Sequence, residues 1–312
     1  MMPRAGGSTA TARASGRRRG ADMLAGSGTD RGARWQVERP DWAPEGVDLS
    51  RPSAARMYDS LLGGAHNFEI DRQAAAQGVA MVPDLPAVAF DNRAFLRRAV
   101  RYLVGQGIRQ FVDIGSGIPT VGNVHEVAQQ ADPACRVVYV DIDGVAVSHG
   151  RAILSGNDNA AAVWGDLREP GRILDTPALR ELVDLDRPVA VLLVAVLHLL
   201  SDDEHPYEAV ATLRDAVAPG SYLAISHLTD TMRPAEAGRL AELSTRLGVP
   251  ITFRPRDQIV RFFDGLTVVE PGVVPLPRWR PGGADGTEGQ GADEAEEAGR
   301  RSFGFAGVGR RD

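Results

Sequence analysis

The stretch Gln110-Phe-Val-Asp-Ile-Gly-Ser-Gly-Ile-Pro119 carries the strongest structural signal in this chain of 312 residues. An apolar run of strand length ends there in a turn with two glycines, and a second apolar run, Val137-Val-Tyr-Val-Asp141, ends in an acid. Glycine permits a tight turn and a close approach of the backbone to a ligand. Ligands of open α/β sheets bind at the carboxyl ends of the strands. We therefore expect a ligand over this turn, with Asp141 beside it.

Strand and helix patterns alternate along most of the chain. Because five apolar runs alternate with helical stretches, we expect a doubly wound, Rossmann-like α/β sheet that is mostly parallel. Seven strands are expected, at residues 110–115, 136–141, 161–165, 189–197, 221–227, 266–270 and 302–308. The last two have no helix between them and can pair antiparallel. Helices are expected near residues 53–62, 69–80, 90–105, 121–131, 144–155, 175–184, 203–217, 233–247 and 256–263.

The same patterns divide the chain into three regions. Residues 1–48 are expected to be a disordered arm, since the segment 1–36 holds seven arginines, two aspartates and almost no large apolar side chain. The helices within residues 49–108 precede the first strand and are expected to form a cap over the ligand edge of the sheet. Residues 109–310 are expected to form the α/β domain, with a flexible acidic loop at 281–299.

The composition of the chain limits the classes of binding partner and the cellular compartment to be expected. A net charge of −6 gives no reason to expect nucleic acid, although the arginine-rich arm keeps that alternative open. The apolar run 189–197 is too short to cross a membrane, which takes about 20 residues. The single cysteine, Cys135, excludes an internal disulfide and fits a reducing cytoplasm. The six histidines lack metal-binding spacing, so no metal is expected. Met23 is a second candidate for the first residue.

The turn after the first strand also limits which class of ligand can bind there. A dinucleotide-binding turn would have a third glycine at position 120, where the pyrophosphate rests on the helix N-terminus. Thr120 occupies this position and Pro119 precedes it, which disfavours a nicotinamide oxidoreductase. S-adenosylmethionine carries no phosphate, and its ammonium group favours a nearby acid such as Asp113. The alternative is an ordinary strand-to-helix turn.

Two acids at the ends of later strands extend this ligand site. The carboxylate of Asp141 matches the paired hydroxyls of a ribose, and charge-assisted hydrogen bonds of this kind are strong. Asp143 is a weaker candidate that can instead cap the next helix. Asp166 can accept the exocyclic amine of adenine while the backbone N–H of Leu167 reaches a ring nitrogen. A second helix cap is an equal alternative for Asp166.

The fourth strand leads to the expected reaction end of the site. Residues just after it, from Ala195 onward, line the methyl-bearing end in folds of this kind. His198 follows there and is either a base that orients an acceptor or a buried histidine with a structural role. His227 ends the fifth strand at the same sheet edge. With His66 and Tyr58 of the expected cap, these residues are the candidates for catalysis, and none is singled out.

The chain resembles a known family over residues 48–310. It is similar to the actinobacterial S-adenosylmethionine-dependent methyltransferase family that was first catalogued as a domain of unknown function. The matching stretches recur in order: Arg56-Met-Tyr-Asp-Ser-Leu-Leu-Gly-Gly64, Asn92-Arg-Ala-Phe-Leu-Arg-Arg98, Phe111-Val-Asp-Ile-Gly-Ser-Gly-Ile-Pro-Thr120, Asn123-Val-His-Glu126, Val138-Tyr-Val-Asp-Ile-Asp143, Gly165-Asp-Leu-Arg168, Leu193-Val-Ala-Val-Leu-His198, Phe262-Phe-Asp-Gly265, Val274-Pro-Leu-Pro-Arg-Trp-Arg-Pro281 and Ala306-Gly-Val-Gly-Arg310.

The resemblance implies a class I methyltransferase fold whose final strand is inserted antiparallel, with S-adenosylmethionine as cofactor. It implies that residues 58–68 belong to the cap. The chain departs from the family pattern at Ala65-His66, where Lys-Asp is usual, and at Ile142 and Gly144, where Asn and Pro are usual. The resemblance supplies no acceptor. The residues it places around the cofactor are Gly115, Ser116, Gly117, Asp141 and Asp166, and Ile142 follows the ribose acid.

These observations combine into one predicted function and one alternative. The prediction is a cytoplasmic methyltransferase that acts on an oxygen or nitrogen of a small molecule. The alternative is a non-catalytic regulator or partner protein that binds S-adenosylmethionine in the same pocket. Residues 58–68 discriminate between them, because a regulator needs no channel for an acceptor.

Overall fold

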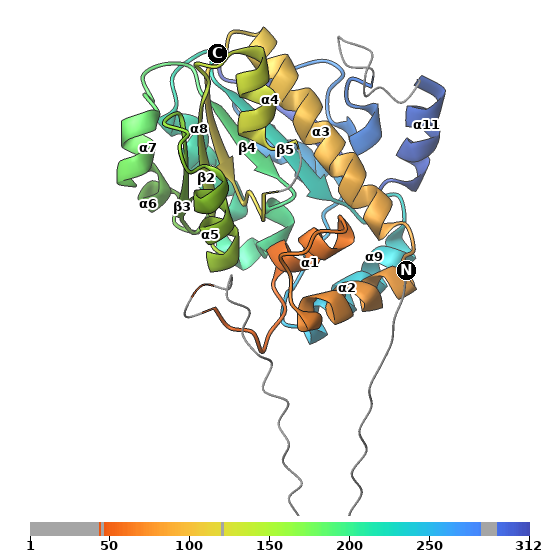
Figure 1. Ribbon diagram of the computed structural model, residues 1–312. Coiled ribbons are helices and arrows are strands. Elements are labelled where there is room, and N and C mark those ends of the chain that lie inside the picture. The colour runs from red at the N-terminus through yellow and green to blue at the C-terminus, as the bar shows by residue number, and fades with distance from the viewer. Residues whose placement is uncertain (1–43, 45–46, 120–121, 282–291) are drawn as a thin grey trace, which may run out of the picture. The chain divides into compact units, whose positions relative to one another are not determined.

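The computed structural model describes residue 44 and residues 47–119, 122–281 and 292–312 (Figure 1). Of the arm expected at residues 1–48, only 44, 47 and 48 fall within these ranges. Thr120, which argued against a dinucleotide, and residues 282–291 of the expected acidic loop lie outside the described residues.

An eight-stranded sheet forms the centre of the described chain, in the order β3-β2-β1-β4-β5-β8-β6, with β7 pairing with β8. β1 to β5 are parallel, and β8 runs antiparallel between β5 and β6. This confirms the mostly parallel sheet and the antiparallel insertion of the final strand. The strands are β1 (Gln110–Ile114), β2 (Arg136–Asp141), β3 (Ala160–Trp164), β4 (Ala190–Val194), β5 (Tyr222–Leu228), β6 (Thr267–Val268), β7 (Val274–Pro275) and β8 (Gly304–Arg310).

Helices cover both faces of the sheet, because side chains alternate between its two faces. Phe111 packs with α3 and α4 on one face, and its neighbour Val112 packs with α6, α7 and α8 on the other. The helices are α1 (Ala54–Leu61), α2 (Glu69–Met81), α3 (Leu85–Gly105), α4 (Val124–Ala131), α5 (Gly144–Ile153), α6 (Pro170–Leu174), α7 (Pro177–Leu182), α8 (Pro206–Ala216), α9 (Pro234–Arg246), α10 (Arg256–Val260) and α11 (Ala292–Arg301).

The helices before β1 lie in two different places. α1 and α2 lie at one end of the sheet, where α2 packs against α9 (Figure 1). α3 instead runs along the sheet and contacts α4, β4 and β5. Its buried side chains Phe95, Ala99 and Leu103 form a stripe at helical spacing, so the helix is held by the sheet, and it also contacts α1 and α2.

Three elements differ from the expected pattern. The structure adds β7 as an eighth strand of two residues and α6 as a helix of five, both too short to give a periodic signal. Residues 292–299, expected in the flexible acidic loop, lie in helix α11, which corrects that prediction. The acids Asp293 and Glu294 occupy its first turn, where the helix dipole favours negative charge. Ala295 and Ala298 are buried and hold the helix in place.

Candidate functional site

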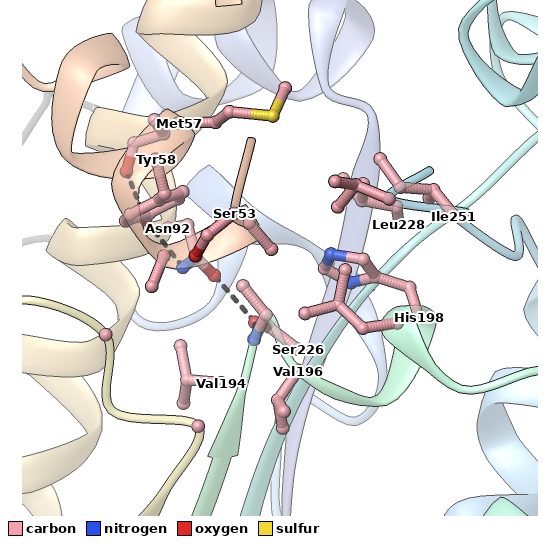
Figure 2. Close-up of a pocket in the computed structure, with 18 of the residues that line it drawn as sticks. Ser53, Met57, Tyr58, Asn92, Val194, Val196, His198, Ser226, Leu228 and Ile251 are labelled. Carbon is pink, nitrogen blue, oxygen red and sulfur yellow. Dashed lines mark hydrogen bonds between the residues drawn. The ribbon is translucent and has the colours of Figure 1, made fainter. Parts of the chain in front are cut away.

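A cavity of about 580 Å³ opens at the carboxyl ends of β1, β2, β4 and β5 and continues beneath α1 and α2. Its volume is in the range of about 300–1,000 Å³ that is usual for small-molecule sites. Figure 2 shows side chains from α1, α3, β4, β5 and the following loops around this space. Of the nine residues expected to hold a cofactor, all nine line it: Asp113, Gly115, Ser116, Gly117, Asp141, Ile142, Asp166, Leu167 and Ala195.

The two glycines of the turn after β1 have different surroundings. Both have positive φ values, +71° at Gly115 and +68° at Gly117, which favour glycine. A Cβ atom at Gly115 would lie 2.3 Å from Cγ2 of Val196, so this glycine lets the loop after β4 pack against the turn. A Cβ atom at Gly117 would meet no atom within 4 Å. Gly117 therefore faces open space, which leaves room for a ligand to approach the turn closely.

Asp141 joins the ends of β1 and β2. Its Oδ2 accepts a hydrogen bond from the N–H of Gly117 at 2.7 Å, and its Oδ1 accepts one from the N–H of Asp143 at 2.8 Å. The side chain is nearly inaccessible, and burial raises its pKa to about 6 despite those backbone donors. A carboxylate oxygen has more than one lone pair, so both oxygens can accept a further hydrogen bond from a ligand.

Asp113 is a second buried acid beside Asp141. Burial raises its pKa to about 7, Arg93 opposes that shift, and the nearby charge of Asp141 adds to it. Two acids with raised pKa values in one cavity favour a positively charged ligand, because a cation restores the charged form of both. Such clusters of perturbed groups in a cavity are typical of functional sites.

Asp166 is already paired within the protein. Arg168 Nη2 lies 2.6 Å from its Oδ2, the N–H of Arg168 donates to its Oδ1, and Arg168 also contacts Glu204. This pair, which is partly exposed, lowers the pKa of Asp166. Leu167 is buried beside it, whereas Ile142, which follows the neighbouring strand β2, is 51% exposed. Arg168 and Glu204 were not expected at the site.

A chain of hydrogen bonds crosses the cavity wall from β4 to α1 (Figure 2). The N–H of Ala195, a residue with φ of +60°, donates to Ser226 Oγ at 2.9 Å. Ser226 Oγ donates to Asn92 Oδ1 at 2.6 Å, and Asn92 Nδ2 donates to Tyr58 Oη at 2.9 Å. Tyr58 Oη donates in turn to the carbonyl of Ala89, and burial raises the pKa of this tyrosine.

Sequence reasoning missed the two central members of this chain, Asn92 and Ser226. Asn92 stands in a helix and Ser226 in a buried strand, and neither position gives a local signal of contact between them. One indication was available. A serine inside the apolar strand Tyr222–Leu228 must find a hydrogen-bond partner when it is buried.

His227 is held by two hydrogen bonds, one of them with a buried arginine. Its Nδ1 pairs with the carbonyl of Leu228 at 2.6 Å, and Arg254 Nη1 lies 2.8 Å from its Nε2. An arginine only donates, so Nε2 accepts and Nδ1 carries the proton. Burial, the nearby His198 and Arg254 lower the pKa of His227 well below its usual value, although the bond to Leu228 opposes the shift. Its lone pair is therefore not available to a ligand.

His198 lines the same end of the cavity, opposite Tyr58 (Figure 2). Its ring lies edge-on to that of His227, with 5.7 Å between the ring centroids. Burial, helped by the charge of Arg254, lowers its pKa to about 3. Its Nδ1 is buried and has no hydrogen-bond partner among the described residues. An unpaired polar atom of this kind is costly, and a ligand that supplies the missing partner would relieve the cost.

His66 does not line this cavity, unlike the other three catalytic candidates. Its backbone N–H donates to Asp59 at 3.0 Å, and its ring lies 3.9 Å from that of His149 on α5, measured between centroids. The segment after α1 turns it away from β4 and β5, toward α5. The structure therefore brings Tyr58, His198 and His227 together and leaves His66 apart.

The described residues offer neither a metal-binding cluster nor a membrane-spanning helix. No group of three or more His, Cys, Asp or Glu side chains in the described ranges has the geometry to hold a metal ion. None of the helices in that part of the chain combines the length and the apolar character that a membrane span requires.

The chain is similar to one family of known proteins, both in sequence and in structure. The profile of a family described as S-adenosyl methyltransferase matches residues 40–312. The chain is similar to the crystal structure of a protein from Thermobifida fusca YX described as a candidate methyltransferase, with 43% identity and a TM-score of 0.80 over 87% of this chain and 99% of that one. It is also similar to a DUF574 family protein from Streptomyces avermitilis MA-4680, with 35% identity and a TM-score of 0.77 over 84% and 98% of the two chains. No curated protein sequence matches it.

Proposed function

Since this chain belongs to the S-adenosyl methyltransferase family, whose cofactor is S-adenosylmethionine, we propose that it transfers a methyl group to an oxygen or nitrogen of a small molecule. One observation carries the proposal. The cavity that begins at the glycine turn and the two buried acids does not end there, but continues past Ser226 and His198 into a second space. A single cavity thus has room for a cofactor and for an acceptor.

The donor set fits the cofactor. We assign Asp141 to the ribose hydroxyls and Asp113 to the cationic methionyl end, because both acids are buried and a positive ligand favours their charged forms. Gly117 leaves open space for the close approach of a ligand to the backbone. The adenine is assigned to the rim formed by Ile142, Asp166 and Leu167. Since Arg168 already occupies part of the Asp166 carboxylate, Asp166 contributes less to affinity than Asp141.

When bound, S-adenosylmethionine supplies a methyl group on a sulfonium, which is an excellent leaving group. The residues of this chain then have to position an acceptor and exclude water. Correct positioning alone is worth about 7–11 kcal/mol of the barrier in favourable cases. The hydrogen-bond chain through Ser226, Asn92 and Tyr58 fixes the wall between β5 and α1, and so defines where an acceptor rests.

His198 is the residue we propose to contact the acceptor. With a pKa of about 3 it is neutral near pH 7, and it has a nitrogen that no described residue satisfies. A neutral imidazole can orient a hydroxyl or an amine by a hydrogen bond. His227 is excluded from this role because Arg254 occupies its lone pair, and Tyr58 because its hydroxyl donates to Ala89.

A small acceptor is favoured over nucleic acid by the charge of the chain, which is −6 overall. The alternative of a non-catalytic regulator is disfavoured by the cavity. Within the expected cap segment 58–68, only Tyr58 and Leu61 line it, and space continues beyond them.

The test is a measurement of S-adenosylhomocysteine formed from S-adenosylmethionine, with and without pools of small phenols, alcohols and amines. The proposal expects product formation that depends on one class of acceptor and is lost in Asp141→Ala. If the protein binds S-adenosylmethionine but no pool raises turnover above the background without enzyme, the regulator is the better description.

A further inference from the structure

The cavity has two chemically different ends. All the charged residues that line it among the described ones lie near the carboxyl ends of β1 to β4, where Arg93 of α3 acts on the charge of Asp113: Arg93, Asp113, Asp141, Asp143, Asp166, Arg168 and Glu204. The other end is built by α2, α9 and the segment 247–253. We call this second part the apolar chamber and define it by its lining residues Ala74, Ala75, Gly78, Leu240, Leu243, Ser244, Leu247, Val249, Ile251 and Phe253.

The apolar chamber contains no charge and no free hydrogen-bonding side chain among its described lining residues. Ser244 is its one polar side chain, and its hydroxyl both donates and accepts a hydrogen bond within the protein. Its Oγ donates to the carbonyl of Ala241 at 2.8 Å and accepts from the N–H of Ile251 at 3.0 Å. A charged group placed in this chamber would lose its hydration without gaining a partner, which is costly.

The chamber keeps its space because α2 presents small residues to it. Ala74, Ala75 and Gly78 lie on one face of that helix, opposite Leu240 and Leu243 of α9. A Cβ atom at Gly78 would lie 3.1 Å from Leu85 and 3.9 Å from Leu240, so larger side chains on this face would fill the chamber. Protein interiors rarely leave such apolar volume empty, since the lining atoms lose their contacts.

The polar groups that border the chamber lie at its mouth. His198, with its unpaired nitrogen, stands beside Leu228 and Ile251, as Figure 2 shows, and Ser226 and Asn92 face it across the cavity. A molecule seated in the apolar chamber would therefore present one polar atom toward the charged end. That arrangement matches a ligand with an apolar body and a single hydroxyl or amine.

We propose that the methyl acceptor is an uncharged, largely apolar molecule, whose body occupies the apolar chamber and whose one polar atom reaches His198. This rests on the proposed function. It narrows the acceptor from any small molecule to a hydrophobic one, and it disfavours amino acids, sugars, nucleotides and carboxylic acids.

The experiment uses the fluorescence of N-phenyl-1-naphthylamine, an uncharged probe, with the full chain in the presence and absence of S-adenosylhomocysteine. Two displacing ligands share a naphthalene ring and differ in charge: methyl 1-naphthoate is neutral and 1-naphthoate is an anion. The proposal expects the ester to displace the probe at a concentration at least about tenfold lower than the acid. Equal displacement by both, or no probe binding, overturns it without any variant.

A matched pair of variants locates the bound probe. Ala75 lines the chamber, whereas the next residue, Ala76, is exposed on the same helix. Ala75→Phe is expected to weaken probe binding by at least about tenfold and to leave the affinity for S-adenosylhomocysteine within about twofold, while Ala76→Phe changes neither. Equal probe binding by both variants overturns the proposal. Failure of S-adenosylhomocysteine to bind the wild-type chain contradicts the proposed function instead. The probe titration then still tests whether the apolar chamber binds an uncharged ligand.

Discussion

The side chains of Ser226 on β5 and Asn92 on α3 meet in a hydrogen bond of 2.6 Å, although 134 residues separate them in the sequence. Both are almost inaccessible. Asn92 also donates to Tyr58 on α1, so one amide ties the edge of the sheet to the first helix. The position of the cavity wall therefore depends on this pair.

Replacing Asn92 by alanine should destabilise the protein strongly. The change leaves Ser226 Oγ and Tyr58 Oη without their shared partner inside the protein, and each unsatisfied buried group costs about 1–3 kcal/mol. We expect the free energy of unfolding to fall by about 2–4 kcal/mol in urea denaturation. Asn159→Ala removes a more exposed amide and serves as the control. Equal losses in the two variants would show that the bridge contributes nothing.

Gly115→Ala should cost more stability than Gly117→Ala. Both changes force an alanine into a positive φ, which costs about 1–2 kcal/mol. Only the first also drives a Cβ atom into Val196, and such overpacking costs typically about 1–3 kcal/mol more. Thermal and urea unfolding of both variants measure the difference. A larger loss of stability in Gly117→Ala than in Gly115→Ala would contradict the close contact between Gly115 and Val196.

Much of the sheet that positions the cavity residues could be predicted from the sequence. β1 and β4 are apolar runs buried along their whole length, and their burial is encoded locally. Asp113 lies near the end of β1 and Asp141 ends the apolar strand β2, and a strand fixes where its last residues lie. The burial of the strands and the positions of the two acids therefore depend on neighbours within a few positions.

Other parts of the site could not be predicted, because they depend on contacts between distant segments. Arg254 reaches His227 and Asp202 from a loop with no motif of its own. The residue type of His66 groups it with the other histidines, but the path of the chain after α1 brings it to His149. The acidic composition of residues 292–299 predicts a loop, and only the burial of Ala295 and Ala298 reveals that they form the packed helix α11.

The affinity for S-adenosylmethionine should fall as the pH falls below about 7. In the ligand-free protein burial raises the pKa of Asp113 to about 7 and that of Asp141 to about 6. The cationic ligand favours the ionised acids, so protons compete with it at low pH. We expect the dissociation constant to rise by up to about tenfold per unit of pH in this window, measured by calorimetry between about pH 8 and pH 5.5.

The variant Asp113→Asn gives the control for this pH dependence. Its affinity for S-adenosylmethionine should be weaker at pH 8 and should lose the part of the pH dependence that lies near pH 7.

The stability of the ligand-free wild type should depend on pH in the opposite direction to this affinity. A raised carboxyl pKa means that the folded state holds the proton more tightly than the unfolded chain, so stability falls as the pH rises from about 4 to about 7. A flat stability profile over that range would contradict the burial of these charges.

Replacement of His198 should separate transfer from cofactor binding. His198→Gln removes the imidazole that faces the acceptor but no group assigned to the cofactor. We expect kcat/KM to fall by at least about tenfold, with the affinity for S-adenosylhomocysteine within about twofold. His66→Gln is the matched control, because His66 lies outside the cavity. Loss of cofactor affinity in His198→Gln, or equal rates in the two variants, would rule out the assigned role.

The measurement that bears most directly on the cofactor site is isothermal titration of the protein with S-adenosylmethionine, S-adenosylhomocysteine and NAD. Asp141→Ala and the exposed-acid control Asp186→Ala are titrated alongside. We expect micromolar binding of both sulfur ligands, no binding of NAD, and a loss of affinity of at least about tenfold in Asp141→Ala only. If folded wild-type protein binds neither sulfur ligand, or if Asp141→Ala binds them as tightly as Asp186→Ala, the glycine turn and its acids are not the cofactor site.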